Sequence, residues 1–581
     1  MKRREFLTSS LMLAAASMLG APPARAATDR VRPGLTGWPT DTDWADLKRA
    51  TGGRLAPVTS PKAEEFIKNP FYIRDQPGLT QSSGWLDAWR LQPSAYVVEA
   101  ESAADIVAAV RFAKAHNLRL VVKGGGHSYF GTSCAPDSLL IWTRRMNVIT
   151  VHDAFTPEGS NVAPVPAVSV GAGSIWLHVY QAVTGGAGRY VQGGGCTTVG
   201  VGGLVLGNGF GTFSKAYGSA GASLLEAEIV TADGAVHVVN AAQEPDLFWA
   251  LKGGGGGTFG VVTRFTLATH ALPETFGAAS LTLKAHSDEA FRKLLARFVA
   301  LYEENLFNPH WGEQARARPD NVLQLSLNFQ GLSKAEATAA FKPLLEFVDA
   351  NKVDYEGQNS LSVASVWARY LWNGWLYRTL ARSVAEFDQR SGASWTDFWW
   401  AGTSGEIGAF WHAYTSAWMP QSLLKPENQQ RLVNAWFAAS RQWGTTFHFN
   451  KGLAGAPEAA IRAARDTATN PDMVDAFALA IIGAAGPALF DGLPAPDLAK
   501  AAAQRDRVYA AMAALRAVAP DTGAYFNESD YFQKDWQEAF WGANYERLLE
   551  VKRRYDPDGL FYVHHGVGSE GWSADGFAHE G

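Results

Sequence analysis

The hydrophobic and polar positions in the first half of the chain switch repeatedly between helical and strand spacing. Over Ser102–His116, apolar residues recur every three to four positions, which predicts a helix capped by Ser102. The apolar run Leu118–Val122 follows at once and predicts a strand. Asp233-Gly234, between two apolar stretches, predicts the turn of a β-hairpin. The other elements predicted in this half are strands at Leu139–Trp142, Ala167–Val170, Leu224–Thr231, Ala235–Val239 and Val261–Ala268, and short helices at Ser174–Val183 and Asp246–Leu251.

Longer segments begin near residue 271. Ser287–Glu304 has the pattern of an amphipathic helix, and Val322–Phe329 alternates as a strand. Ser333 and Glu336 form a capping box, which predicts a helix over Lys334–Val348. The mixed order of helices and strands predicts an α+β fold that changes domain near residue 271.

Composition and charge are those of a globular protein long enough for more than one domain. The 581 residues are 47% hydrophobic and 18% charged, with a net charge of −5. No basic cluster is present, so we expect neither nucleic acid nor an anionic membrane as a partner. Two cysteines, Cys134 and Cys196, cannot form a disulfide scaffold. From the residues alone they could form one disulfide or remain two buried thiols.

The N-terminus has the features of an export signal. Lys2-Arg3-Arg4 precedes Phe6-Leu7 and an apolar stretch too short to span a bilayer, and Ala24-Arg25-Ala26 is a cleavage site of the A-x-A type. The paired arginines predict a twin-arginine signal at residues 1–26 and a periplasmic or secreted protein, with the export machinery as a transient partner. We expect no membrane span in the mature chain, which begins near Ala27.

Three glycine-dense loops border predicted strands. They are Lys123–Gly131, Val191–Gly211 and Lys252–Gly260, and the first two contain His127 and Cys196. Glycines remove every Cβ, so backbone N–H groups can close around the phosphates of a ligand. A single such loop could equally be a tight turn. Three of them predict a long ligand held by the main chain.

Together these loops resemble the vanillyl-alcohol-oxidase type of FAD-binding domain and, within it, the berberine-bridge-enzyme-like oxidases. The resemblance implies bicovalent FAD, bonded at the flavin 8α carbon to His127 and at C6 to Cys196, and no metal. It leaves Cys134 unexplained. It also implies that the cofactor contacts Gly124, Gly125, Gly126, Ser128, Gly131, Thr198, Val199, Gly200, Gly203, Gly260, Val262 and Asn544.

The C-terminal segment extends the resemblance. Tyr525-x-Asn527-x-x-Asp530 and the following helix, Asn544–Arg554, look like the berberine-bridge element, which lines the substrate side of the flavin. This implies that Tyr525 is the general base, braced by Asn527 and Asp530. Because a free phenol has a pKa of about 10, we expect donors or cations beside Tyr525. The alternative is a buried structural tyrosine. The adjacent pair of histidines, 564 and 565, is expected to be structural.

The second loop carries both a functional cue and departures from the family pattern. Val199 stands where the family's oxidases have valine, which favours oxygen as the electron acceptor. Thr197 replaces a frequent proline, and Leu204 and Asn208 replace the usual histidine and glycine. Those last two changes put details of flavin attachment in doubt, whereas the glycines needed for FAD binding are kept.

Tryptophan is concentrated in the second half. Ten of the 21 tryptophans lie between Trp367 and Trp443. Single tryptophans of this kind usually pack in a core, but the cluster suggests an aromatic-walled cleft suited to sugar faces or flat rings.

We therefore expect a two-part FAD-binding domain at 27–270, a substrate domain with an antiparallel sheet backed by helices at 271–510, and the berberine-bridge element at 511–581. The predicted function is oxidation of a hydroxyl-bearing small molecule or oligosaccharide by FAD, with molecular oxygen reduced to hydrogen peroxide. Two alternatives stay open. One is a dehydrogenase that oxidises a secondary metabolite or aromatic alcohol with a non-oxygen acceptor. The other is a non-enzymatic exported carbohydrate-binding protein.

Overall fold

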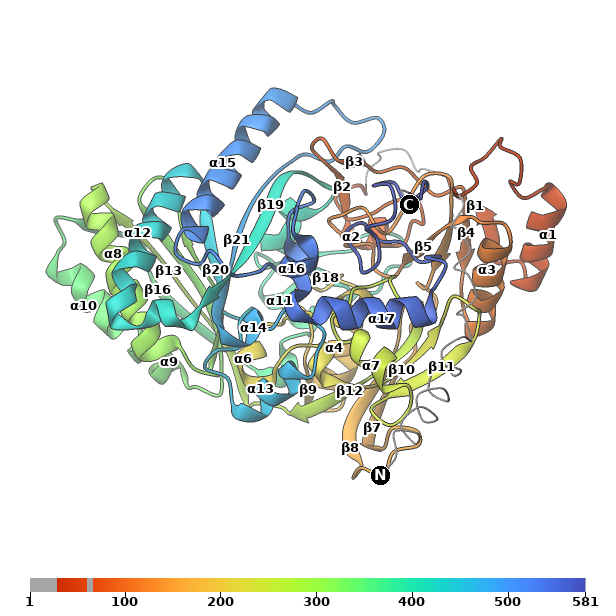
Figure 1. Ribbon diagram of the computed structural model, residues 1–581. Coiled ribbons are helices and arrows are strands. Elements are labelled where there is room, and N and C mark those ends of the chain that lie inside the picture. The colour runs from red at the N-terminus through yellow and green to blue at the C-terminus, as the bar shows by residue number, and fades with distance from the viewer. Residues whose placement is uncertain (1–28, 60–65, 580–581) are drawn as a thin grey trace, which may run out of the picture.

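The computed structural model describes residues 29–59 and 66–579 (Figure 1). The predicted export signal at 1–26 lies outside the described residues. Three large sheets organise the rest of the chain, and they confirm the α+β class.

The first sheet has four strands and carries the first glycine loop. In spatial order the strands are β1 (Leu55–Pro57), β4 (Tyr96–Glu99), β6 (Ser138–Trp142) and β5 (Arg119–Lys123). Strands β4, β6 and β5 run parallel, so the chain must cross over between β4 and β5, and α3 (Ala103–Ala115) makes this crossover. The predicted cap is confirmed, because the Ser102 hydroxyl accepts a hydrogen bond from the Asp105 N–H. Buried side chains of α3 and of α1 (Asp41–Ala50) pack on this sheet.

The second sheet lies beside the first and carries the other two glycine loops. Its order is β11 (Val236–Asn240), β10 (Leu224–Val230), β12 (Val261–Ala271), β8 (Val165–Gly171) and β7 (Ile149–Phe155), with β9 (Arg189–Val191) also paired to β12. The predicted hairpin of β10 and β11 is confirmed. The short helices of this part are α2 (Pro70–Arg74), α4 (Trp176–Tyr180), α5 (Val201–Leu206), α6 (Ser214–Tyr217) and α7 (Pro245–Ala250).

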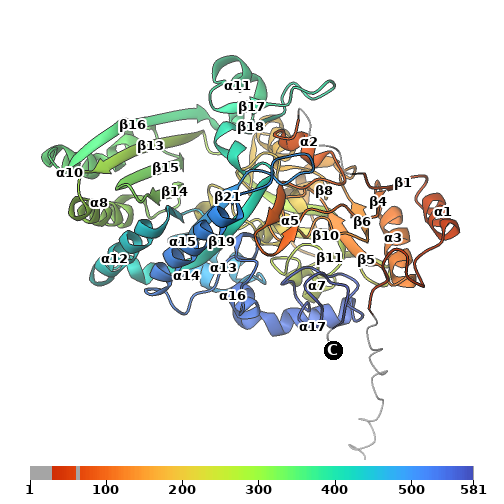
Figure 2. The ribbon, with the colours of Figure 1, turned by 90° about the horizontal axis from the view of Figure 1, so that it is seen from above.

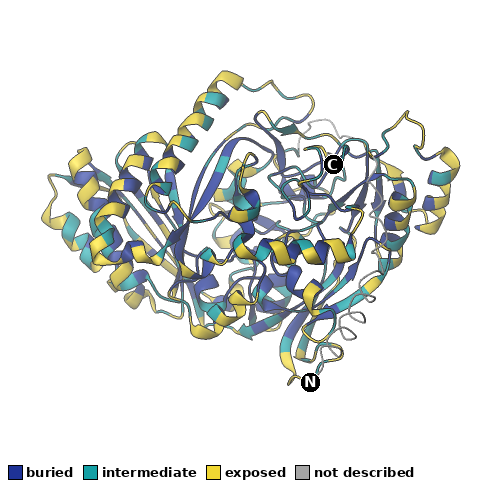
Figure 3. Ribbon diagram, in the orientation of Figure 1, coloured by how far each residue is buried: buried dark blue, intermediate teal, exposed yellow. Residues whose placement is uncertain are grey.

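The third sheet forms the second half of the molecule. Its nine strands are, in order, β16 (Tyr355–Trp367), β13 (Thr275–Ala285), β15 (Val322–Gln330), β14 (Trp311–Ala317), β20 (Thr445–His448), β21 (Ala476–Gly486), β19 (Ala409–Pro420), β2 (Ser82–Trp85) and β3 (Trp89–Arg90). Helices α8 (Asp288–Leu301), α12 (Pro426–Gln442) and α15 (Leu498–Arg516) line one side of it (Figure 2). Their inward faces and the sheet share one apolar core, whereas the side chains of β13 and β15 that point away from this core are exposed or half-buried (Figure 3).

Smaller elements complete this half. A two-stranded ribbon, β17 (Ala385–Phe387) and β18 (Phe398–Trp400), lies beside α11 (Gly374–Leu380). The remaining helices are α9 (Lys334–Ala340), α10 (Lys342–Ala350), α13 (Glu458–Arg465) and α14 (Asp472–Asp475).

Three features differ from the sequence-based expectation. Strands β2 and β3 fall within the expected first domain but extend the edge of the third sheet, where Ser82 pairs in parallel with Ala409. The helix predicted over Lys334–Val348 is broken between α9 and α10. Pro343 has no N–H and cannot continue the helical hydrogen bonds from α9. Helix α4 continues as a π-helix, Gln181–Gly186, rather than as a regular α-helix.

The C-terminal segment returns to the first two sheets, as the family resemblance implied. Helices α16 (Trp536–Trp541) and α17 (Tyr545–Tyr555) pack against the second sheet's core (Figure 1). Phe561 then forms a parallel bridge with Leu120 of β5. The buried ammonium of Lys552 donates to the Thr258 and Phe561 carbonyl oxygens, both at 2.7 Å, so this segment is tied to the third glycine loop.

Within the described ranges, no helix combines the length and the apolarity that crossing a bilayer requires.

Candidate active site

The first two glycine loops touch each other through their backbones. A Cβ placed on Gly125 would lie 2.5 Å from the Gly200 nitrogen, and one on Gly200 would lie 2.6 Å from the Gly125 nitrogen. Gly126 has a φ of +73°, which a side chain would strain. Glycine is therefore required at these positions for the loops to meet.

His127 lies half-buried at the end of the first loop. Its Nε2 is 3.3 Å from the Thr198 hydroxyl oxygen, so the two loops are also joined through side chains. Burial lowers the pKa of His127 to about 4. The imidazole is consequently neutral near pH 7, which is the form that can act as a nucleophile.

Cys196 lies in the second loop, and it is not in a disulfide. Both cysteines are free thiols in the structure, which excludes the Cys134–Cys196 disulfide as an alternative. Burial, followed by Glu406, raises the pKa of Cys196 to about 12, whereas Lys451 lowers it. Cys134 packs with its sulfur 3.4 Å from the Pro77 carbonyl oxygen, under the first loop.

Lys123, the residue before the first loop, is fully buried and holds the chain beneath that loop. Its ammonium donates to the carbonyl oxygens of Gln76 at 2.7 Å, Pro77 at 3.3 Å and Leu79 at 2.5 Å. The Gln81 N–H donates to the Gly126 carbonyl oxygen at 2.9 Å, which pins the same segment to the loop. The Lys123 ammonium therefore fixes the segment 76–79 beneath the first loop, which carries His127.

The third loop and the open sides of the other two fit a long ligand. A Cβ on Gly203 would meet no atom within 4 Å, so this glycine faces open space. The Thr258 hydroxyl in the third loop is buried without a hydrogen-bond partner among the described residues. The open space beside Gly203 can admit a ligand, and the unpaired Thr258 hydroxyl can bind it. Both features suit a dinucleotide held by the main chain.

The other predicted cofactor residues lie in several different settings. Ser128 and Val199 lie in the two touching loops. Gly131 and Gly260 instead make close packing contacts, with the Trp89 ring and the Val230 carbonyl oxygen. Asn544 donates to the Thr469 carbonyl oxygen at 2.9 Å, and Thr469 lies against Gly253 of the third loop. Val262 is buried within β12. Direct contact between these residues and FAD stays a prediction.

Asn208 is one of the departures from the family pattern. It has a φ of +53°, the left-handed conformation that explains why glycine is usual there and that asparagine tolerates best after glycine. Its amide donates to the Thr467 hydroxyl at 3.2 Å. The Leu204 side chain fills space against Gly194 and Gly209. Both replacements are accommodated without disturbing the loops.

Tyr525 is buried beside the second loop. Its ring packs against Phe210 and Trp418, and Asn527 donates to its hydroxyl at 3.0 Å. Burial, followed by the Glu528 carboxylate, raises the pKa of Tyr525 well above its ordinary value. We expected a hydrogen-bond donor or a cation beside this phenol, and the donor is present as the Asn527 amide. The ammonium of Lys451 binds Glu528 at 2.6 Å instead of the phenol.

Several charged residues near Cys196 were missed by the sequence reasoning. Glu313, Glu406 and Glu528 all raise the pKa of the Cys196 thiol and Lys451 lowers it, so all four lie within electrostatic range of the sulfur. Glu528 could have been noticed, because it lies inside the tyrosine motif. Glu313 and Lys451 belong to strands and turns of the third sheet, and no local pattern marks them.

The tryptophans of the cluster are divided among the glycine loops, the core and the surface. Trp400 donates from its indole nitrogen to the Gly195 carbonyl oxygen at 3.0 Å, next to Cys196. The Trp411 ring lies 4.7 Å from that of Tyr129, two residues after His127. Trp418 and Trp436 are fully buried, whereas Trp367, Trp375 and Trp395 are exposed. Two tryptophans of the cluster therefore lie beside the first two loops, and an aromatic-walled cleft stays a prediction.

His564 and His565 pack in a stack of rings behind the first loop. The His564 ring lies 3.8 Å from that of Tyr531 and 3.9 Å from that of His565. Phe130 of the first loop meets this stack edge-on, 5.8 Å from His564. The C-terminal element thus supports the loop that carries His127.

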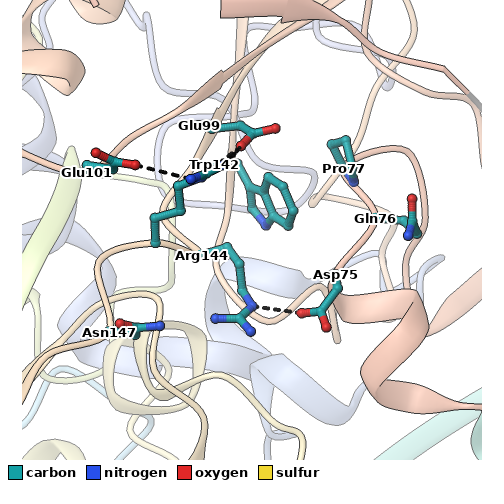
Figure 4. Close-up of a pocket in the computed structure, with 9 residues that line it drawn as sticks. Asp75, Gln76, Pro77, Glu99, Glu101, Trp142, Arg144 and Asn147 are labelled. Atoms are coloured by element: carbon teal, nitrogen blue, oxygen red, sulfur yellow. Dashed lines mark hydrogen bonds and ion pairs between the residues drawn. The ribbon is translucent and has the colours of Figure 1, made fainter. Parts of the chain in front are cut away.

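A separate open groove of about 750 Å³ lies on the first sheet, at the ends of β4 and β6 (Figure 4). Arg144 pairs with Asp75 there at 2.9 Å, and Asp75 also accepts from Arg390 at 2.9 Å. Burial alone would raise the pKa of Asp75, but Arg74 and Arg144 outweigh it and hold this pKa below its ordinary value. Ion pairs therefore line this groove, around Asp75 on one side and between Arg145 and the pair Glu99 and Glu101 on the other.

Replacing that carboxylate should destabilise the fold. We expect Asp75→Asn to lower the free energy of unfolding near pH 7 by about 2 kcal/mol, because Arg74 is buried and loses its counter-charge. The folded-state pKa of Asp75 is depressed, so its stabilisation is present at neutral pH and is lost as the pH falls through that pKa. Denaturant melts of both proteins at pH 7 and pH 3 measure this. Equal stability at pH 7 would contradict it.

Comparisons with known proteins agree with this architecture. The family model for the FAD binding domain matches residues 93–240, and the model for berberine and berberine-like proteins matches 524–568. The VAO-type flavoprotein oxidase VAO615 of Thermothelomyces thermophilus is 30% identical over 94% of each chain. The FAD-linked oxidoreductase easE of Arthroderma otae is 32% identical over 83% of this chain and 74% of its own.

Solved structures show the same fold. The crystal structure of VAO-type flavoprotein MtVAO615 from Myceliophthora thermophila C1 has a TM-score of 0.76 and 26% identity, covering 94% of this chain and 99% of that one. Glucooligosaccharide oxidase from Acremonium strictum has a TM-score of 0.65 at 18% identity, over 90% of this chain and 98% of that one.

Fold, loops and relatives define an FAD-linked oxidoreductase. The chain belongs to the berberine-bridge-enzyme-like family of VAO-type flavoprotein oxidases.

Proposed function

We propose that this protein is an exported oxidase that holds FAD through two covalent bonds and oxidises a hydroxyl-bearing substrate, passing the electrons to molecular oxygen to give hydrogen peroxide. One observation carries the proposal. The glycine loops bearing His127 and Cys196 contact each other backbone to backbone, which supports a single ligand bonded to both side chains. The glucooligosaccharide oxidase of Acremonium strictum carries a 6-S-cysteinyl, 8α-N1-histidyl FAD, which supports the same pair of bonds here.

The chain's own residues suit this chemistry. FAD, when bound, supplies the two-electron acceptor. The neutral imidazole of His127 is held by Thr198, which orients it for bonding. Tyr525 is proposed to take the proton from the substrate hydroxyl as its phenolate, whose oxygen accepts a hydrogen bond from Asn527. Val199 at the second loop favours oxygen as the acceptor over a separate electron carrier.

An oligosaccharide is the first substrate class that we propose, and an aromatic or other secondary-metabolite alcohol is the second. Structural neighbours include a chitooligosaccharide oxidase and a xylooligosaccharide oxidase in complex with xylobiose. The half-buried ring of Trp400, hydrogen-bonded to Gly195 beside Cys196, offers an apolar face that either class could use. Export rests on the twin-arginine leader, and fractionation of expressing cells tests it.

The covalent bonds give a direct test. We expect acid-precipitated protein to stay yellow and its intact mass to exceed that of the chain by one FAD. Cys196→Ser should keep one bond, to His127, and the peptide that carries the flavin identifies it by mass spectrometry. His127→Ala with Cys196→Ser should release all colour on precipitation.

A colourless wild-type pellet would overturn the bicovalent proposal. The acceptor is tested separately, by measuring peroxide formed for each substrate oxidised. A ratio near one supports the oxidase, and absence of peroxide with an active artificial acceptor supports the dehydrogenase instead.

A further inference from the structure

Exposed large apolar side chains are concentrated in one short part of the chain. Six of the 14 found among the described residues lie between residues 367 and 395, and all three exposed tryptophans are among them. Single exposed apolar residues are ordinary on a protein surface, but such a concentration marks a surface that contacts something apolar. The six are Trp367, Tyr370, Trp375, Leu380, Val384 and Trp395.

These residues surround α11 and the ribbon β17–β18, which stand out from the rest of the molecule in Figure 2. The segment is held by its own hydrogen bonds. Asn373 caps α11 by accepting from the Leu376 N–H at 3.2 Å, and the Ala401 N–H donates to the Val384 carbonyl oxygen at 3.1 Å. The exposed side chains therefore project from a folded element and not from an unsupported loop.

An arginine lies over two aromatic rings within this surface. The guanidinium carbon of Arg378 is 4.3 Å from the centre of the Phe387 ring and 4.0 Å from that of the Trp395 ring. Trp375 precedes Arg378 by one turn on the same face of α11. Stacking orients a guanidinium without using its N–H groups, and the buried Nε of Arg378 has no hydrogen-bond partner among the described residues. Its donors are therefore available to an acceptor from outside.

The arginines of this surface are not balanced by acids. Arg382 donates to the Arg378 carbonyl oxygen at 2.7 Å, Arg369 donates to two other carbonyl oxygens, and none of these three pairs with a described carboxylate. The segment 367–400 contains three acids, and each has a partner elsewhere. Glu386 accepts from Ser404 at 2.7 Å, Asp388 binds Arg390 at 2.6 Å and Asp397 binds His178 at 3.0 Å.

The partner of this surface should therefore combine an apolar phase with negative charge. A second copy of the chain, bound through the same face, would set arginines against arginines. A polysaccharide offers no apolar phase for Leu380 and Val384, whose side chains are 75% and 46% exposed. An anionic bilayer offers both, because tryptophan and tyrosine favour the headgroup level and guanidinium groups bind phosphates.

We propose that α11 and the ribbon β17–β18 dock on a membrane surface that contains anionic phospholipids. The apolar side chains enter the headgroup region, and Arg378 and Arg382 bind the lipid phosphates. The contact is peripheral, since it places side chains and not the backbone among the lipids. Composition argued against an anionic membrane because the sequence has no basic cluster, but here the neighbouring acids are engaged and aromatic rings add to the attraction. The interaction goes beyond the proposed oxidation, because it requires no substrate.

Vesicle sedimentation tests the proposal with the holoenzyme. The vesicles are phosphatidylcholine alone or phosphatidylcholine with phosphatidylglycerol, at low salt so that the charges are little screened. We expect at least tenfold tighter binding to the anionic vesicles. Arg378→Gln with Arg382→Gln should reduce that preference to less than threefold. Trp375→Ser with Trp395→Ser should weaken binding to the anionic vesicles at least tenfold, because the apolar contacts are lost.

Matched controls separate this surface from general attraction. Arg292→Gln, at an exposed arginine that lies 3.6 Å from the Phe437 ring on the other side of the chain's second half, should bind anionic vesicles like wild type. Val353→Ser, at an exposed valine, should do the same. If Arg378→Gln does not fold, the exposed Arg382→Gln alone should lose at least threefold of the preference.

Three results would overturn the inference. The first is equal binding of wild type to both kinds of vesicle, or no binding to either. The second is a loss in Arg292→Gln as large as that in the Arg378 and Arg382 pair, which would indicate attraction by overall charge. The third is a wild-type dimer in light scattering that the two tryptophan substitutions convert to a monomer, because a second copy would then cover the surface.

Discussion

Replacing Tyr525 with phenylalanine is expected to slow flavin reduction by substrate about 10²- to 10⁴-fold, the range that a positioned general base contributes. The phenol is buried with its oxygen fixed by Asn527, so the substitution removes a single oxygen atom and leaves the packing against Phe210 and Trp418 intact. Anaerobic stopped-flow measurement of flavin bleaching gives the rate.

Two further measurements show whether the slower flavin reduction comes from loss of the base rather than from a disturbed structure. Tyr370→Phe, at an exposed tyrosine, should reduce flavin at the wild-type rate. Reoxidation of the reduced flavin by oxygen should be the same in wild type and Tyr525→Phe, because the phenol acts only in the first half-reaction. A Tyr525→Phe enzyme that reduces its flavin at the normal rate would remove Tyr525 from the chemistry.

Lys123→Met should have the largest effect on the cofactor site as a whole. The substitution leaves the carbonyl oxygens of Gln76, Pro77 and Leu79 buried without their donor. We expect the free energy of unfolding to fall by about 3 kcal/mol. The segment 76–79 beneath His127 is then free to move, so the share of protein with FAD bonded to His127 should fall as well.

The two effects are measured on the same preparation, by thermal melting and by mass spectrometry of the flavin peptide. Lys48→Met, at an exposed lysine of α1, is the matched control and should change neither. If Lys123→Met melted like wild type and carried full covalent flavin, the ammonium would have no role in shaping the loop.

Much of the first half could be predicted because its signals are local. The cap at Ser102, the turn at Asp233-Gly234 and the glycine loops each depend on neighbours in sequence, and the structure shows the cap and the hairpin as expected. The contact between Gly125 and Gly200 explains why the loops must be glycine-rich, although the sequence alone could not pair them.

The rest of the site depends on contacts between distant segments. Glu313 reaches the cysteine loop only because β14 approaches Thr212, and Lys451 is neutralised only because Glu528 returns from the C-terminal element. The sequence pattern therefore does not reveal that Asn527 donates to the Tyr525 phenol. It also does not reveal that the Lys451 ammonium binds Glu528 instead. The break between α9 and α10 was local, since Pro343 was visible in the sequence, whereas the capping box of Ser333 and Glu336 begins α9 as predicted.

The pairing of β2 with β19 has a consequence for how the protein matures. Strand β2 is synthesised early but pairs with β19, which is synthesised much later. Leu120 of β5 likewise forms its bridge only with Phe561, near the end of the chain. The third sheet therefore gains its β2 edge only after β19 is made, and the first sheet gains its bridge to Phe561 only near the end of synthesis. Separately expressed halves should therefore fail to fold, and flavin loading should be a late event that follows release from the ribosome.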